Sequence, residues 1–285
     1  MVNEKIEQAF GIMQEQGVDL WLTFVHETGT APDPVLDLLA GVHVVWPSAF
    51  ILTASGKALA IVGSLDVHGV QDAAPRYEVI GYRDSIAEPL LKVLDEVQPG
   101  RIAINYSTND IMADGLSHGL YLILTDYIKG TPWAKRLISS EGLVAALRGR
   151  KSPSELSRIK SAIRETLDIY ERVTAHVRVG MSEQEVAAFI TDRMEGRGLT
   201  PAWEADHCPS VFTGPDTAGA HAGPTARRIA PGHIMNTDFG VRYEGYVSDL
   251  QRTWYFLRPG EHQAPPEVQK GFDTIYGAIQ AAAAA

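Results

Sequence analysis

The chain changes character at one point, and this point limits the folds open to it. Ser152–Glu155 is a strong helix start, with serine at the N-cap, proline at the first helical position and glutamate three residues after the cap. Apolar residues then recur at helical spacing as far as Val177. Helix and strand signals alternate before this start, whereas two helices and then a sheet-like stretch follow it. We therefore predict an α/β domain over residues 1–150 and an α+β domain over residues 151–285.

The individual elements follow from periodicity and from turn residues. In the first domain we expect a helix at 3–16 that ends at Gly17, a strand at 18–25, two strands around Ser55-Gly56, a helix at 86–97 and a strand at 101–106. In the second domain the long helix runs to Gly180. A capping box at Ser182–Glu185 then opens another helix, to about Gly196.

Composition excludes several classes of function. The formal charge of −10 argues against a general nucleic-acid binder, which needs a basic surface. Cys208 is the only cysteine, so no intrachain disulfide forms and a reducing, cytoplasmic location fits. The N-terminal residues lack a signal-peptide pattern, and no apolar run reaches the length of a membrane span. We expect no nucleic-acid or membrane partner.

The segment Asn236–Phe256 reads as a β-hairpin that carries one aspartate in each arm, Asp238 and Asp249. Aspartate is depleted in strands, so two on one hairpin need a reason. A turn around Tyr243–Gly245 places them either directly opposite each other or diagonal, depending on its centre. Both registers put the two carboxylates on the same face, where like charges destabilise the pair.

Two readings of this face remain open. It is either the hydrated face of an ordinary hairpin or a site where a divalent cation bridges the carboxylates. Arg242 is a possible neutralising partner, but it lies at the turn. Oxygen ligands alone suit Mg²⁺ or Mn²⁺, and an added imidazole would admit Co²⁺, Fe²⁺ or Zn²⁺.

The hairpin pattern TDFGxxYxGYxSDxxRT resembles the first two metal ligands of the "pita-bread" metallopeptidases, family M24, in the Xaa-Pro aminopeptidase and prolidase branch. The segment CPSVFTGPDTAGAHAGPT resembles the strand and loop before that hairpin. The segment LRGRKSPSELSRIKSAI resembles the entry to the catalytic domain, after a creatinase-type N-terminal domain. The resemblance covers nearly the whole chain and is most specific at the hairpin.

The resemblance implies a dinuclear metal site, in which Asp238 binds one ion and Asp249 bridges both, with Mn²⁺ as the expected metal and Co²⁺, Zn²⁺ or Fe²⁺ as alternatives. A water between the ions would attack the amide carbonyl of a small peptide with proline in the second position. His221 would contact the substrate as a catalytic residue, His207 would lie near the cleft entrance as a substrate-binding residue, and Thr253 would hold a carboxylate. A homodimer is also implied.

The chain departs from the family in one respect. The family's site also needs a histidine and two glutamates from later in the sequence, and the chain ends at GFDTIYGAIQAAAAA before any such motif. We therefore expect a truncated form that lacks the C-terminal part of the pita-bread domain. Two alternative functions stay open: a creatinase-like C–N hydrolase or lyase on the same fold, and a non-catalytic, peptidase-like binding module.

Overall fold

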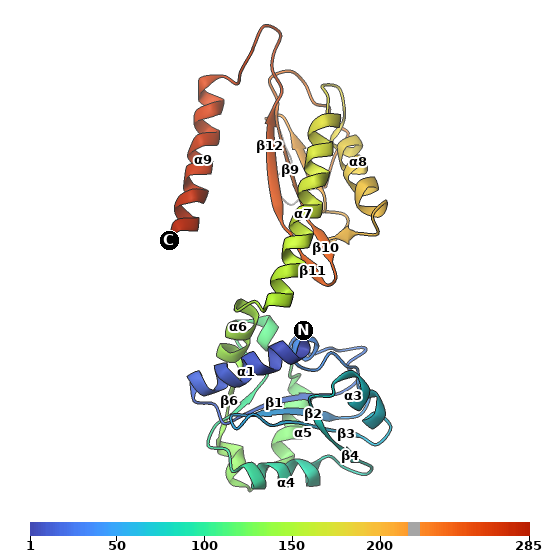
Figure 1. Cartoon of the computed structure of the whole chain (residues 1–285), viewed down its shortest axis with the longest axis vertical. Helices are drawn as coiled ribbons and strands as arrows, with labels where there is room; N and C mark the ends of the chain where they lie inside the picture. Colours follow the sequence, from blue (N-terminus) through green and yellow to red (C-terminus); the bar gives the residue numbers. More distant parts are fainter. Residues whose placement is uncertain (216–222) are drawn as a thin grey trace. The chain divides into compact units, whose positions relative to one another are not determined.

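The computed structural model describes residues 1–215 and 223–285. The chain divides into two compact units, Met1–Pro153 and Ser154–Ala285 (Figure 1). Within the described ranges, no helix combines the length and the apolar character that crossing a membrane requires.

The first unit is built on a six-stranded mixed sheet with the order β4-β3-β2-β1-β5-β6. Its strands are β1 (Leu20–Val25), β2 (Ser48–Thr53), β3 (Ala58–Gly63), β4 (Glu78–Tyr82), β5 (Ile102–Ile104) and β6 (Leu137–Ser139). Strand β2 pairs antiparallel with both β1 and β3, whereas the β3–β4, β1–β5 and β5–β6 pairs are parallel. The central strands are buried along their whole length, as expected for a sheet covered on both faces.

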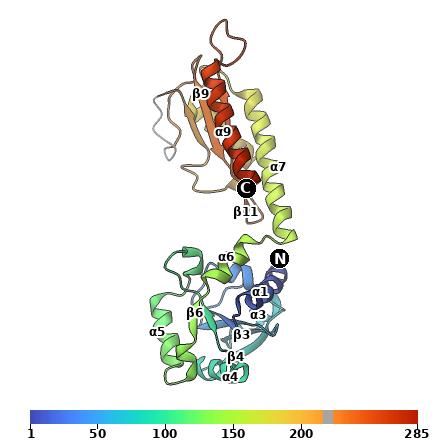
Figure 2. The same ribbon diagram turned by 90° about the vertical axis from the view of Figure 1, so that its left-hand side faces the viewer.

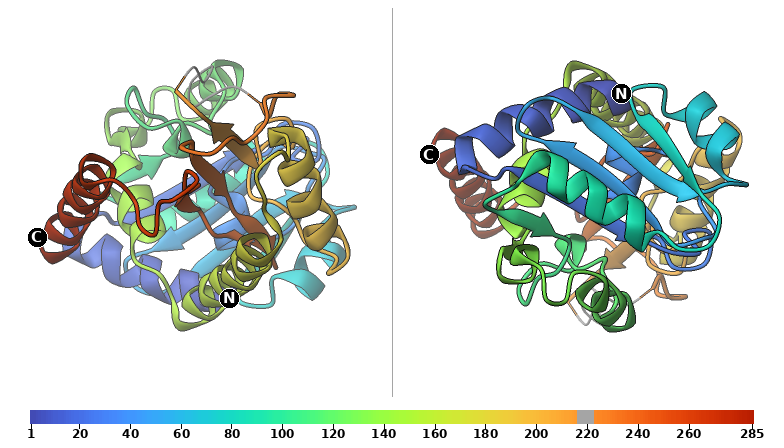
Figure 3. Two further views of the ribbon diagram at one scale, coloured as in Figure 1. Left: turned by 90° about the horizontal axis from the view of Figure 1, so that it is seen from above. Right: turned by 90° about the horizontal axis from the view of Figure 1, so that it is seen from below.

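Helices cover both faces of this sheet. The helices of the first unit are α1 (Val2–Gln16), α2 (Leu36–Leu39), α3 (Val67–Ala73), α4 (Ala87–Val97), α5 (His118–Tyr127) and α6 (Glu141–Gly149), with short 3₁₀ turns at Ile111–Ala113 and Pro132–Lys135. One core cluster joins α1 and α6 to the sheet, and a second joins α4 and α5 to its other face. Figure 1 shows α1 and α4 on opposite faces, and the right-hand view of Figure 3 shows α4 crossing the strands. The predicted α/β class is confirmed.

Two predicted element ends in this unit coincide with glycines of positive φ. Gly17 closes α1 with φ 63°, and Gly56 forms the β2–β3 turn with φ 85°. Both backbone conformations lie in the left-handed region, which favours glycine because it has no Cβ.

The second unit places two helices against small sheets. Its elements are α7 (Pro153–His176), α8 (Glu183–Glu195), β7 (Thr200–Pro201), β8 (Ser210–Thr213), β9 (Ile234–Phe239), β10 (Val241–Tyr243), β11 (Tyr246–Val247), β12 (Leu250–Tyr255) and α9 (Pro266–Ala284). The strands form two three-stranded sheets, ordered β12-β9-β8 and β11-β10-β7. Figures 1 and 2 show α7 running along the first of these sheets, and the core cluster contains residues of α7, α8, β8 and β9.

The buried face of α7 differs from the apolar stripe that the sequence predicts. Leu156 and Leu167 are 43% and 36% exposed, whereas Ala162 and Thr166 are fully buried. The helix also ends at His176, before Gly180. The buried Thr166 hydroxyl hydrogen-bonds the Ala162 carbonyl and the Ser248 hydroxyl, so a threonine is accommodated where periodicity alone favours leucine.

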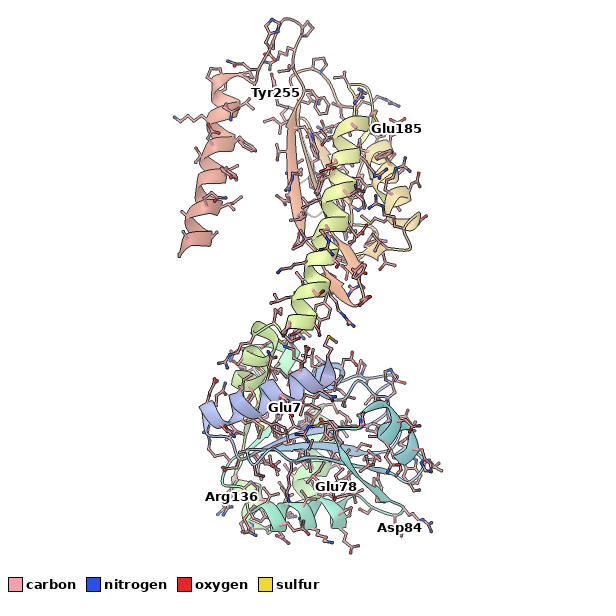
Figure 4. All side chains as sticks on the ribbon, viewed as in Figure 1. Glu7, Glu78, Asp84, Arg136, Glu185 and Tyr255 are labelled. Carbon is pink, nitrogen blue, oxygen red and sulfur yellow. The ribbon has the colours of Figure 1, made fainter. Side chains whose placement is uncertain are left out.

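The predicted capping box at the start of α8 is present. The Glu185 amide donates to the Ser182 Oγ over 3.1 Å, and the Ser182 amide donates to the Glu185 Oε2 over 2.7 Å. Figure 4 labels Glu185 on α8. This reciprocal pair fixes the start of the helix that packs on β8.

Candidate metal centre

Strand β9 places Asp238 on the face opposite to the core. Met235, Thr237 and Phe239 are fully buried, and the residues between them turn to the other face. Strand β9 is the central strand of its sheet, so it is fixed by hydrogen bonds on both sides. Asp238 therefore lies on a well-held backbone.

The strand register brings Asp249 onto the same face. Gln251 pairs directly with Asp238. Asp249 is two residues before Gln251, so it lies diagonal to Asp238, at a spacing that side chains can bridge. This is the second of the two registers that the sequence allows. The turn itself is Glu244-Gly245, with φ 46° and 84°, as in a tight type I′ hairpin.

The hairpin changes sheets between the two aspartates, and a glycine makes this possible. A Cβ on Gly240 would lie 1.7 Å from the Ser248 carbonyl oxygen. The Ser248 amide donates to the Val241 carbonyl over 3.1 Å, but the Val241 amide donates to the Ser248 Oγ over 3.0 Å. A side chain thus replaces a backbone acceptor at the residue before Asp249.

The two oxygens of Asp238 have different surroundings. Oδ2 accepts a hydrogen bond from Gln251 Nε2 over 2.9 Å. Oδ1 is buried and has no hydrogen-bond partner in the structure. Burial raises the pKa of Asp238, the Gln251 hydrogen bond opposes this shift, and the nearby Asp249 charge adds to it. A buried, unpaired carboxylate oxygen is costly, because nothing compensates for the water that it has lost.

Among the described residues, no positively charged side chain neutralises the two aspartates. No Lys or Arg there forms an ion pair with Asp238 or Asp249. The Arg242 guanidinium donates to the Ala202 carbonyl over 2.9 Å instead. Two adjacent carboxylates, one with a buried free oxygen, are a donor set that fits a hard divalent cation. Within residues 1–215 and 223–285, no group of three or more His, Cys, Asp or Glu side chains gathers as a fuller site.

The other predicted site residues have separate positions. His221 lies outside the described residues. His207 is about half exposed, with Nε2 3.5 Å from Asp206 Oδ2. Its carbonyl accepts from Ser210 Oγ over 2.8 Å, and Ser210 pairs with Asp238 across β8 and β9. This places the His207 backbone near the aspartate face, and its substrate-binding role stays a prediction.

Thr253 lies on the predicted face, and its side chain hydrogen-bonds an amide. Its Oγ1 accepts from Asn236 Nδ2 over 3.1 Å, directly across the strand pair. Gln251 contacts the Asp238 carboxylate from this face, and it is not among the site residues predicted from the sequence. The role of Thr253 in holding a carboxylate stays a prediction. Gln251 follows Asp249 by two residues, so strand alternation alone places it on this face.

The fold of this chain is similar to that of solved Xaa-Pro peptidases. The Xaa-Pro dipeptidase from Bacillus anthracis superposes with a TM-score of 0.65 and 22% identity, covering 95% of this chain and 68% of that one. The prolidase from Pyrococcus horikoshii OT3 gives a TM-score of 0.59 and 20% identity, over 94% and 67% of the two chains. The chain thus has the pita-bread fold of these peptidases, as the sequence predicted.

Residues 157–285 match the model of metallopeptidase family M24. The Xaa-Pro dipeptidase of Lactobacillus delbrueckii subsp. lactis is 25% identical over 183 residues, which are 64% of this chain and 47% of that protein. The Xaa-Pro dipeptidase of Lactobacillus helveticus is 26% identical over 203 residues, or 70% and 52% of the two chains. The chain spans about half the length of these curated relatives.

Proposed function

We propose that the protein is a metal-dependent peptidase that hydrolyses small peptides with proline in the second position. The observation that carries this proposal is the buried, unpartnered Oδ1 of Asp238 beside Asp249. The match of residues 157–285 to family M24 supports a peptidase, and the Lactobacillus relatives named as Xaa-Pro dipeptidases support the substrate class.

In this proposal Asp238 and Asp249 hold two divalent ions, with Mn²⁺ as the expected metal. Such ions, when bound, activate water and polarise an amide carbonyl. Gln251 orients the carboxylate of Asp238 by holding Oδ2, so that Oδ1 remains free for a cation. The diagonal placement keeps the two carboxylates close without a direct opposition of charge.

The histidines are assigned to the substrate. His221 contacts the peptide and steadies the negative charge that develops on its carbonyl oxygen, as a donor aimed at that atom would. His207 contacts the peptide from the side of the Ser210 strand. We further propose a homodimer in the cytoplasm.

Hydrolysis of an Xaa-Pro dipeptide and tripeptide by the full chain, with and without Mn²⁺, tests this function. We expect Mn²⁺-dependent release of the first residue, abolished in Asp238→Asn and Asp249→Asn and retained in Asp126→Asn. Asp126 is an exposed aspartate on α5 and serves as the matched control.

Other outcomes would identify the alternatives. Mn²⁺ binding that depends on Asp238, without cleavage of any peptide in a panel, would contradict a peptidase and favour a binding module. Cleavage of a non-peptide C–N bond in place of the Xaa-Pro bond would favour the creatinase-like alternative.

A further inference from the structure

Helix α7 directs a row of hydroxyl groups at the hairpin that carries the two aspartates. Thr166, Tyr170 and Thr174 are four residues apart, so they lie on one face of the helix. Thr166 is fully buried and Tyr170 is 3% exposed. Burying a hydroxyl is unfavourable unless it is hydrogen-bonded, so the partners of these groups indicate what they do.

Thr166 holds the residue before Asp249. The Thr166 hydroxyl lies 3.1 Å from the Ala162 carbonyl oxygen and 2.7 Å from Ser248 Oγ, and either hydroxyl can be the donor in the second contact. The Ser248 Oγ in turn accepts from the Val241 amide over 3.0 Å. This chain of hydrogen bonds keeps the Ser248 side chain in the place of a backbone acceptor.

The Ser248 backbone also makes a close approach to Gly240. The Ser248 hydroxyl contacts Thr166, and the Ser248 carbonyl oxygen lies where a Cβ on residue 240 would be, so only a glycine fits there. The residue before Asp249 is therefore held both by a backbone hydrogen bond to Val241 and by a side-chain contact from α7.

Tyr170 holds the neighbours of both aspartates at once. Its hydroxyl lies 2.7 Å from the Leu250 carbonyl oxygen and 3.1 Å from the Thr237 carbonyl oxygen. Leu250 follows Asp249, and Thr237 precedes Asp238. The ring also packs on Phe239, with 4.4 Å between ring centroids. One phenol thus joins β9 and β12 beside the two carboxylates.

We propose that Thr166 and Tyr170 are positioning residues that set the spacing of Asp238 and Asp249 from the opposite side of the sheet. Their hydrogen bonds fix the residues on both sides of Asp249 and the residue before Asp238. Neither side chain touches a metal or a substrate in this account. The inference rests on the proposed metal site for its functional meaning.

The test is a calorimetric Mn²⁺ titration of the full chain as wild type, Tyr170→Phe and Thr166→Val. Both substitutions keep the shape of the side chain and remove the hydroxyl. We expect the dissociation constant to rise about tenfold in each, the lower end of the effect of removing a group that holds a metal ligand. Thr166→Ser keeps the hydroxyl that Thr166→Val removes, so its Mn²⁺ affinity should match that of wild type.

The matched control is Tyr77→Phe in the first unit. Tyr77 is also buried, and its hydroxyl donates to the Leu39 carbonyl over 3.0 Å. The substitution should lower the melting temperature about as much as Tyr170→Phe does, with unchanged Mn²⁺ affinity. Equal affinity in wild type and Tyr170→Phe would overturn the positioning role.

A second measurement separates this proposal from the proposed function. Hydrogen exchange of the segment 246–252 is followed without metal, and we expect faster exchange in Tyr170→Phe and Thr166→Val but not in Tyr77→Phe. Unchanged exchange overturns the positioning role. If wild type and Asp238→Asn bind Mn²⁺ equally weakly, the metal site is wrong, and the exchange data still decide whether α7 orders the hairpin.

Discussion

Gln251 faces Asp238 directly across the β9–β12 pair, and its Nε2 donates to Asp238 Oδ2 over 2.9 Å. This hydrogen bond lowers the pKa of a carboxyl that burial and the Asp249 charge raise. It also orients the carboxylate so that only Oδ1 is left without a partner.

Replacing Gln251 by leucine should therefore weaken metal binding most at low pH. Loss of the hydrogen bond raises the pKa of Asp238 further, and a metal must displace the proton that the carboxyl then holds. We expect Mn²⁺ affinity to fall about 10- to 100-fold, with the larger loss at the lower of two pH values. Titrations at the two pH values measure this difference.

Gln269→Leu is the control for that substitution. Gln269 donates to Asp273 Oδ1 over 2.8 Å on the exposed helix α9, so the same kind of hydrogen bond is lost away from the hairpin. An equal loss of affinity in both variants would contradict a specific role of Gln251.

Substituting Gly240 by alanine should lower the stability of the second unit. The new Cβ would lie 1.7 Å from the Ser248 carbonyl oxygen. The carbonyl belongs to the backbone and the Cβ is bonded to it, so neither atom can move away without a shift of the backbone. We expect a loss of at least about 2 kcal/mol in the free energy of unfolding, measured in urea. Gly11→Ala on α1, where a Cβ meets nothing within 4 Å, should instead stabilise by about 0.5–1 kcal/mol. Indistinguishable unfolding curves for the two variants would refute the close contact.

Asn105 should be among the costliest single sites in the first unit. Its Oδ1 accepts from Trp21 Nε1 and Ser140 Oγ, each over 2.8 Å, and its Nδ2 donates to Asp33 Oδ2 over 2.9 Å. Alanine would leave these buried groups unpaired, so we expect a loss of about 3 kcal/mol or more. Urea unfolding of Asn105→Ala, beside the exposed Asn109→Ala, measures this cost. A loss below about 1 kcal/mol would show that water replaces the network.

Stability at acid pH should depend on the pair between Asp168 of α7 and Arg197. Hydrogen bonds from Arg197, and then from Arg172, hold the pKa of Asp168 below its ordinary value. A carboxyl whose pKa is lower in the folded state stabilises the fold above its unfolded pKa, about 4, and loses this contribution as pH falls through the folded-state pKa.

Arg197→Gln should therefore show a shallower loss of stability between pH 5 and pH 2 than wild type. Urea unfolding at each pH in low salt measures the slope, and added salt should reduce the difference. Arg178→Gln is the control, because its guanidinium donates to the Val177 and Ala175 carbonyls. If wild type, Arg197→Gln and Arg178→Gln lose stability in parallel as pH falls, the Asp168–Arg197 pair does not cause the acid dependence.

Much of the fold follows from local signals in the sequence. The glycine at position 17, the Ser55-Gly56 turn and the capping box at Ser182–Glu185 each mark an element that the structure contains. Each of these signals depends on only a few neighbouring residues, so the sequence alone indicates the helix end or turn. Family resemblance at the hairpin then supplied the pita-bread fold.

The finer geometry of the site depends on contacts that no local pattern encodes. The choice between the two hairpin registers is made at Glu244-Gly245 and at the close approach of Ser248 to Gly240. The burial of Thr166 in place of Leu167 follows from a hydroxyl partner 82 residues away in the chain. Periodicity records apolar spacing, so it misses a helix face that is held by hydrogen bonds.

The central claim is that Asp238 and Asp249 together hold divalent ions. The most direct measurement is the metal content of the full chain, by mass spectrometry, after equilibration with Mn²⁺ and removal of free metal, with an intact mass on the same sample. For a protein whose intact mass exceeds that of these 285 residues, so that it can carry the later histidine and glutamates, we predict about two ions per chain in wild type and in Asp126→Asn, and fewer than about one in Asp238→Asn and in Asp249→Asn. Equal metal content in all four proteins would contradict the claim.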